Sequence, residues 1–244
     1  MKAVYLPCFL AASSQAAVVI SEFEPNPAGT DPANPDFEIA GGTPGVAFDY
    51  YVVSLENDGY NGTVDRSSRI QGVFDANGIG RASIPDLENP SNTVVLLDIG
   101  GGDAVDFSIG DDLDPANDGN LILPASWSVL DAVGISDSTR DDDVLYGDLL
   151  GGTDILYNGE FEPLLVFREG STGDWFQTVT IDFNDPTQRV GAFAATPAGE
   201  LSEAAFGGSL DPTFGSVNPT FLIPEPSTAL LGGLAALGLL RRRR

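Results

Sequence analysis

The sequence predicts an all-β fold, a sandwich of short strands, followed by one short C-terminal helix. Apolar runs in the interior are short and rich in β-branched and aromatic residues, as strands prefer. Twenty-nine glycines and 17 prolines interrupt these runs. No interior stretch keeps the i, i+3, i+4, i+7 apolar spacing of an amphipathic helix over three turns.

The expected strands lie over residues 18–20, 48–55, 93–97, 128–133, 164–167 and 178–181. Alternation is clearest in the last run, where Val179 and Ile181 face one side and Thr178 and Thr180 the other. Gly, Pro, Asn and Asp separate the runs, and these residues are typical of turns. This pattern favours packed β-sheets.

The charge balance limits the partners of the chain. It carries 36 acidic and 11 basic residues and no histidine, for a formal net charge of −25. Between Ala17 and Pro224 there are six arginines, no lysine and 35 acidic residues. Such a surface repels the phosphates of nucleic acids and anionic lipids, so we predict no nucleic-acid partner.

Residues 1–17 have the pattern of a signal peptide. Lys2 precedes an apolar run over residues 3–12, and the small residues Ser14 and Ala16 precede the expected cleavage site. An N-terminal strand is the alternative interpretation. Cys8 follows Pro7, where a lipoprotein leader needs a small residue, so we favour cleavage by signal peptidase over lipidation.

The C-terminus combines three features in order. Pro224, Glu225 and Pro226 come first, an apolar stretch over residues 227–240 follows, and the chain closes with Arg241, Arg242, Arg243 and Arg244. Proline disfavours helix at and before its position, so the motif is expected to be extended, as suits a protease groove. A helix over the apolar stretch would span about 21 Å, short of a bilayer core of about 30 Å. The arginines would hold its end in the cytoplasm. A simple membrane anchor is the alternative.

Motif, apolar helix and arginine tail together resemble the PEP-CTERM sorting signal, here over residues 223–244. In that family an exosortase, a membrane cysteine transpeptidase, recognises the signal and cuts near the Pro-Glu-Pro motif. The resemblance implies an exported protein that passes through an inner-membrane intermediate. Exosortase and signal peptidase are its implied partners, and the cell surface or the exterior is its destination.

A second resemblance begins directly after the leader. The residues that carry it are Val18, Val19, Ile20, Ser21, Glu22, Asn26 and Pro27, then Phe37, Glu38 and Ile39, and later the stretches over 112–119, 129–134 and 142–147. They are similar to bacterial lamin-tail domains, which implies an immunoglobulin-like β-sandwich over residues 18–191. The Asp-Leu-Ser-Gly-Trp strand of that family is replaced here by residues 46–51. We expect residues 192–222, rich in Ala, Gly, Ser, Pro and Thr, to form a flexible linker.

One acidic segment is the candidate metal site. Its oxygen donors are Asp111, Asp112, Asp114, Asn117, Asp118 and Asn120. Calcium takes six to eight oxygen ligands, and acids on a glycine-containing turn supply them. The EF-hand pattern fails, because Ala125 stands where a bidentate glutamate is required. The alternative is a solvated acidic loop. Residues 141–143 form a second acidic cluster.

Two glutamates interrupt apolar strands. Glu22 and Glu38 each share a strand face with an apolar or small residue. We favour the interpretation that they are solvated carboxylates at a sheet edge, where they discourage pairing with other sheets. The alternative is a structural role through hydrogen bonds with the backbone.

The composition excludes most catalytic sites. Without histidine, and without cysteine or lysine after leader removal, Ser-His, Cys-His, Ser-Lys and imidazole-metal centres are impossible. We therefore predict a non-enzymatic adhesion or structural module. The alternatives are a carbohydrate-binding module of the exopolysaccharide matrix, with Trp127 and Trp175 stacking on sugars, and an accessory domain of a secreted hydrolase. Buried tryptophans are the expected arrangement in a sandwich.

Overall fold

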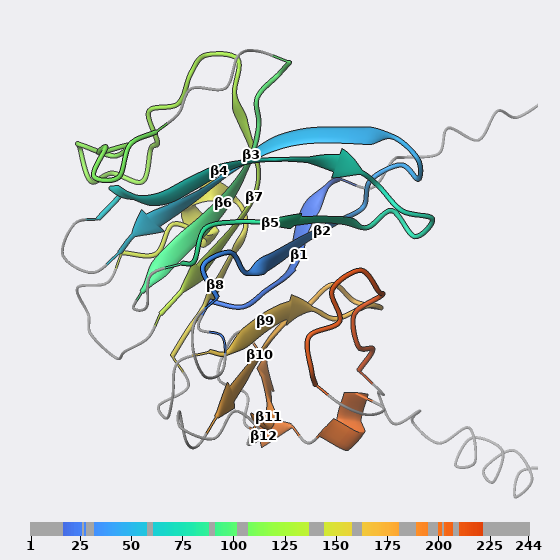
Figure 1. The fold of residues 1–244 in the computed structure, drawn as a ribbon. Helices are drawn as coiled ribbons and strands as arrows, with labels where there is room; N and C mark the ends of the chain where they lie inside the picture. Colours follow the sequence, from blue (N-terminus) through green and yellow to red (C-terminus); the bar gives the residue numbers. More distant parts are fainter. Residues whose placement is uncertain are drawn as a thin grey trace, which may run out of the picture.

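The computed structural model describes residues 17–25, 27, 32–57, 61–87, 91–101, 107–136, 144–157, 163–180, 189–194, 200–201, 203–206 and 210–221. Within them it contains β-strands and two short 3₁₀ turns, η1 (Asp148–Leu150) and η2 (Glu203–Phe206), and no α-helix (Figure 1). The predicted all-β class is confirmed.

The strands form two sheets. The seven-stranded sheet has the order β12 (Glu200–Leu201), β11 (Arg189–Ala194), β10 (Trp175–Thr180), β9 (Leu165–Arg168), β1 (Val19–Phe23), β2 (Asp36–Ala40) and β5 (Gly80–Ser83). The five-stranded sheet has the order β4 (Val64–Val73), β3 (Ala47–Glu56), β6 (Asn92–Asp98), β7 (Ser128–Ile135) and β8 (Thr153–Ile155). In the described strands the pairings are antiparallel, except that β7 and β8 are parallel.

A shared apolar core joins the two sheets. Phe23 and Phe37 of the seven-stranded sheet belong to the same cluster as Val52 and Leu96 of the five-stranded sheet. Alternate residues of β3 and β6 belong to a second cluster on the opposite face of the five-stranded sheet, where the loops around Leu113 and Trp127 cover them. This double coverage explains why the apolar run of β6 does not alternate with polar residues. The arrangement agrees with the predicted β-sandwich.

The folded domain continues into the stretch predicted as a linker. β11 pairs with β10, and residues 210–221 pack on the domain (Figure 1). Phe206 and Leu210 are buried in a third cluster with Phe167 and Phe176, and Phe221 packs against it. The expected flexible linker over residues 192–222 is therefore wrong for the part that is described. Burial of these apolar side chains offsets the entropy cost of ordering a stretch rich in small residues.

Both predicted targeting segments fall outside the described residues. This applies to the signal peptide, apart from Ala17, and to the apolar stretch over residues 227–240. Where the chain is described, none of its helices has the length and apolar character needed to cross a membrane.

Candidate functional site

Residues 210–221, here called the strap, lie against the seven-stranded sheet at the end of the described chain (Figure 1). Three buried glutamates hold it. Glu22 lies on β1, Glu38 on β2 and Glu169 directly after β9. The neighbouring order β9-β1-β2 brings the three glutamates to adjoining strands or, for Glu169, to the turn directly after one.

Glu22 binds the start of the strap. Its side chain is fully buried, and its two oxygens accept hydrogen bonds from the Thr213 N–H at 2.7 Å and the Thr213 hydroxyl at 2.9 Å. Burial raises the pKa of Glu22 to about 7, although the two hydrogen bonds from Thr213 act in the opposite direction. The nearby carboxylate of Glu38 raises the pKa further.

Glu38 binds the strap two residues later. It lies opposite Glu22 in the β1–β2 register, is fully buried, and accepts a hydrogen bond from the Gly215 N–H at 2.7 Å. Gly215 has a φ of 81°, a left-handed conformation that glycine adopts without strain. Burial raises the pKa of Glu38, and the hydrogen bond from Gly215 opposes this shift.

The interpretation of Glu22 and Glu38 as solvated edge carboxylates is wrong. β1 and β2 are interior strands, because β9 covers one side of the pair and β5 the other. The strap then covers the two carboxylates. The alternative, a structural role through hydrogen bonds with the backbone, is what the structure shows.

Glu169 binds the end of the strap. It accepts hydrogen bonds from the N–H groups of Ser171 at 2.8 Å, Thr172 at 2.6 Å and Phe221 at 2.5 Å. The hydroxyls of Ser171 and Thr172 donate as well. Burial alone would raise the pKa of Glu169, but these donors outweigh it and lower the pKa to about 2. Glu169 is thus a fixed anion that joins its own turn to the strap.

Asn218 completes the attachment. Its amide nitrogen donates to the carbonyl and hydroxyl oxygens of Ser21 and to the carbonyl oxygen of Arg168, at 2.9–3.0 Å. The Gly170 N–H donates to the Pro219 carbonyl at 3.1 Å. The strap is therefore bound to β1, to β2 and to the turn after β9, which are all distant from it in sequence.

A cavity of about 300 Å³ lies beside the strap, lined among others by Ser21, Ile79, Arg168, Thr172 and Val217. Among the described residues that line it, Arg168 alone carries a positive charge, and its guanidinium is already engaged. It donates to the carbonyls of Ile20 and Gly173 and to Asp131, and it stacks on Trp175 at 4.6 Å. Arg168 therefore serves the fold and is not offered to an anion.

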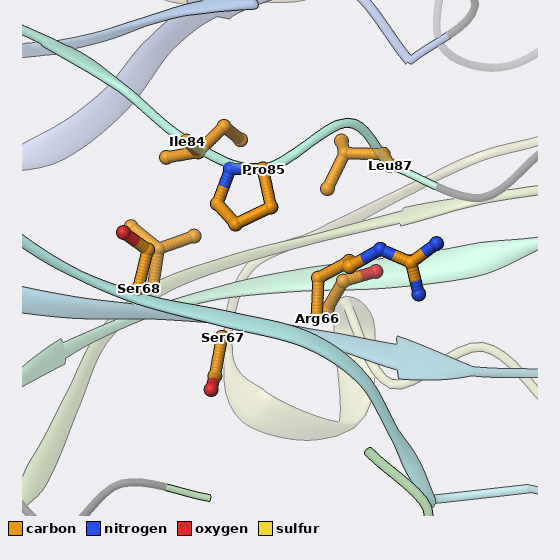
Figure 2. Close-up of a pocket in the computed structure, with 8 residues that line it drawn as sticks. Arg66, Ser67, Ser68, Ile84, Pro85 and Leu87 are labelled. Atoms are coloured by element: carbon orange, nitrogen blue, oxygen red, sulfur yellow. The ribbon is translucent and has the colours of Figure 1, made fainter. Parts of the chain in front are cut away.

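A second pocket is shown in Figure 2. Ile84, Pro85 and Leu87 face β4 there, near Arg66 and Ser68, while Ser67 points away and donates to the Phe107 carbonyl. The space between atoms amounts to about 160 Å³, but it is too narrow to admit water. It is a packing gap between a loop and the sheet and not a ligand site.

The acidic loop is organised around Asp114, which is 1% exposed. Its carboxylate accepts hydrogen bonds from the N–H groups of Asp118 at 3.1 Å and Gly119 at 2.9 Å, and from the Tyr146 hydroxyl at 3.0 Å. Burial alone would raise the pKa of Asp114, but these donors outweigh it and lower the pKa. Both oxygens of the central acid are therefore occupied by the protein's own donors.

The other three aspartates of the predicted calcium site also accept hydrogen bonds from the loop backbone. Asp111 accepts from the Ser108 N–H, Asp112 from the Asp114 N–H, and Asp118 from the Asn120 N–H. Asn117 has a left-handed φ of 49°. Over the described residues, no three acidic side chains come together as a metal would require. The second acidic cluster, residues 141–143, lies outside the described part of the chain.

The two tryptophans do not form a sugar-binding platform. Trp127 is 7% exposed and packs on Tyr51 and Phe107, while Trp175 is 3% exposed and contacts Phe23 edge-on. A stacking platform needs an open ring face, so this part of the carbohydrate-binding alternative is wrong. The expected burial is confirmed.

Beyond the strap, the chain matches a family model. Residues 222–244 match the PEP-CTERM protein-sorting motif. The match contains the predicted residues Pro224, Glu225 and Pro226 and the arginine tail, all outside the described part of the structure. It supports an exported protein that an exosortase processes and that reaches the cell surface or the exterior. It begins one residue after the strap ends.

No curated protein and no solved structure matches the chain. The resemblance to lamin-tail domains therefore rests on the residues that first indicated it. The structure supports its coarser implication, an all-β domain of two sheets.

Proposed function

We propose that this protein is sorted to the cell surface or the extracellular matrix by an exosortase and acts there as a non-catalytic adhesion or structural module. The observation that carries the proposal is the sorting motif at residues 222–244, which directly follows a folded β-domain. The domain is the part that is delivered, and we propose that it is an immunoglobulin-like sandwich of the lamin-tail type.

The proposed route has three steps. Signal peptidase removes residues 1–17 during export. The apolar stretch over residues 227–240, with Arg241 to Arg244 behind it, holds the chain in the inner membrane. The exosortase then cuts near Pro224, Glu225 and Pro226 and releases the domain from the membrane, with exopolysaccharide as the proposed partner outside.

Two features support a non-catalytic module. The chain has no histidine, and its only cysteine lies in the predicted leader. The best-buried acids, Glu22, Glu38, Asp114 and Glu169, each accept at least one hydrogen bond from the protein itself. Carboxylates in this state organise the fold and are not presented to a substrate.

The proposal is tested in a host with an exosortase and in the same host without it. We expect the wild-type chain to appear as a shortened form at the surface or in the medium only when the exosortase is present. A Pro224→Ala, Glu225→Ala, Pro226→Ala triple variant should stay at full mature length in the membrane. Ser216→Ala, at an exposed position of the strap, is the control and should behave as wild type. Identical mass and fractionation of all chains in both hosts would overturn the proposal.

A further inference from the structure

The strap ends very close to the sorting motif. The Phe221 N–H is bonded to Glu169, and only Leu222 and Ile223 separate Phe221 from Pro224. Three residues of fully extended chain span at most about 11 Å. Glu169 therefore fixes the last described residue before the motif.

Docking also occupies the backbone of the strap. The N–H groups of Thr213, Gly215 and Phe221 point to buried carboxylates. A protease groove binds its substrate as an extended chain through backbone groups close to the cleavage site. The Phe221 N–H, three residues before Pro224, cannot bind Glu169 and such a groove at once.

We propose that Glu22, Glu38 and Glu169 are positioning residues for the sorting reaction, which hold the strap on the domain until it is released for cleavage. The inference rests on the proposed function, because it concerns the substrate side of the same reaction. Release of the strap frees the residues before the motif and increases the reach of the motif from the domain. The folded domain thereby sets how fast its own motif is processed.

The size of the effect follows from a two-state equilibrium. If only the released strap is cleaved, the rate is proportional to the released fraction as long as that fraction is small. Loss of one charge-assisted hydrogen bond changes such an equilibrium about tenfold. Glu169→Gln keeps the shape of the side chain and removes its charge, so it should speed processing about tenfold.

Two further variants frame this test. Asn218→Ala loosens the strap from its own side, because it removes the bonds to Ser21 and Arg168. Asp174→Asn is the matched control, since Asp174 accepts from Thr172 in the same turn and is exposed. Its rate should equal that of wild type.

The experiment follows processing of the full chain in exosortase-containing membranes, together with amide exchange of the same proteins. We expect faster cleavage of Glu169→Gln and Asn218→Ala, with lost protection in the strap and retained protection in β1, β3 and β6. Unchanged or slower cleavage of these variants, while the Pro224, Glu225, Pro226 triple variant is not processed, would overturn this inference alone. Normal processing of the triple variant would instead overturn the proposed function. If Glu169→Gln also loses protection from amide exchange in the sheets, the cleavage rate of Asn218→Ala is the result that supports or overturns the inference.

Discussion

The strap and the acidic loop both depend on buried carboxylates that accept backbone hydrogen bonds, but the donors come from different distances. Asp114 binds N–H groups four and five residues ahead of it, within its own loop. Glu22 binds Thr213, which is 191 residues away, and Glu38 binds Gly215 at a separation of 177 residues. The same type of hydrogen bond stabilises a local turn in one region and joins the two ends of the folded domain in the other.

The two regions also differ in the protonation that they favour. Asp114 accepts hydrogen bonds from three residues, and its pKa is lowered. Within the described residues, Glu22 accepts hydrogen bonds from Thr213 alone and lies opposite Glu38, and burial raises its pKa to about 7. Burial favours the neutral form of every one of these carboxyl groups, and the number of hydrogen-bond donors decides whether the charged form is favoured instead. Glu169, with donors from its own turn and from the strap, behaves like Asp114.

The largest effect on stability is expected at Glu169, because this carboxylate both shapes its own turn and binds the distant strap. Glu169→Ala removes the acceptor of the Ser171, Thr172 and Phe221 N–H groups and should lower the free energy of unfolding by about 3–5 kcal/mol. Urea unfolding monitored by tryptophan fluorescence measures this. Asp174→Asn should change it by less than about 0.5 kcal/mol. A loss below 1 kcal/mol at Glu169 would show that the strap is not bound as described.

A smaller effect is expected from the pH dependence of Glu22. Its pKa of about 7 in the folded protein exceeds the usual 4.5, so the folded state binds the proton more tightly than the unfolded state. The associated stability is fully present below about pH 4.5 and is lost as the pH rises through 7. Wild type should therefore be more stable at pH 5.5 than at pH 8 by about 2 kcal/mol from this group.

Glu22→Gln checks this sign. The variant has no titrating group at this position. Its free energy of unfolding should therefore change less between pH 5.5 and pH 8 than that of wild type, by the same amount. Urea unfolding of both proteins at the two pH values gives the comparison. Equal pH dependence of the two chains would contradict the assignment to Glu22.

The acidic loop should respond locally. Asp114→Asn weakens the bonds from Asp118, Gly119 and the Tyr146 hydroxyl and should cost about 1–2 kcal/mol. Combined with Tyr146→Phe in a double-mutant cycle, it should show a coupling of about 1 kcal/mol. Amide exchange of the strap should not change. Loss of strap protection in this variant would remove the distinction between the two regions.

Calcium is expected to have the smallest effect. A loop site with a Kd near 1 mM adds about 0.4 kcal/mol at 1 mM calcium, or about 1 °C in Tm. If the calcium site predicted from the sequence exists, the Tm should rise by this amount at 1 mM calcium and by more at 10 mM. The Asp112→Ala variant should show no such rise. Magnesium at equal concentration controls for ionic strength. A Tm that does not respond to calcium would leave the loop with only its backbone role.

The sequence predicts those parts of the fold whose signal is local. The runs that became β3, β6 and β7 are β-branched and apolar because packing covers them, and this is visible in the residues themselves. The turn around Asn117 and Gly119 also follows from residue types that tolerate positive φ.

The candidate site could not be predicted in the same way. Whether Glu22 and Glu38 lie at an edge depends on β9 returning to pair with β1, and that pairing joins residues more than 140 positions apart. The strap has the composition of a linker, because its two apolar anchors, Leu210 and Phe221, stand among small residues; both pack with Phe206, which precedes the strap. The available signal was a glutamate placed inside each of two apolar strands.

The strap also determines how a pulling force enters the domain. Tension applied at the sorting motif reaches Phe221 first, then Asn218, and then Gly215 and Thr213, because these residues are bonded in this order to the turn after β9 and to the sheet. We expect these attachments to open one after another, before the interstrand hydrogen bonds of the seven-stranded sheet bear load. A domain tethered through its C-terminus would thus have a short extensible segment between its tether and its core.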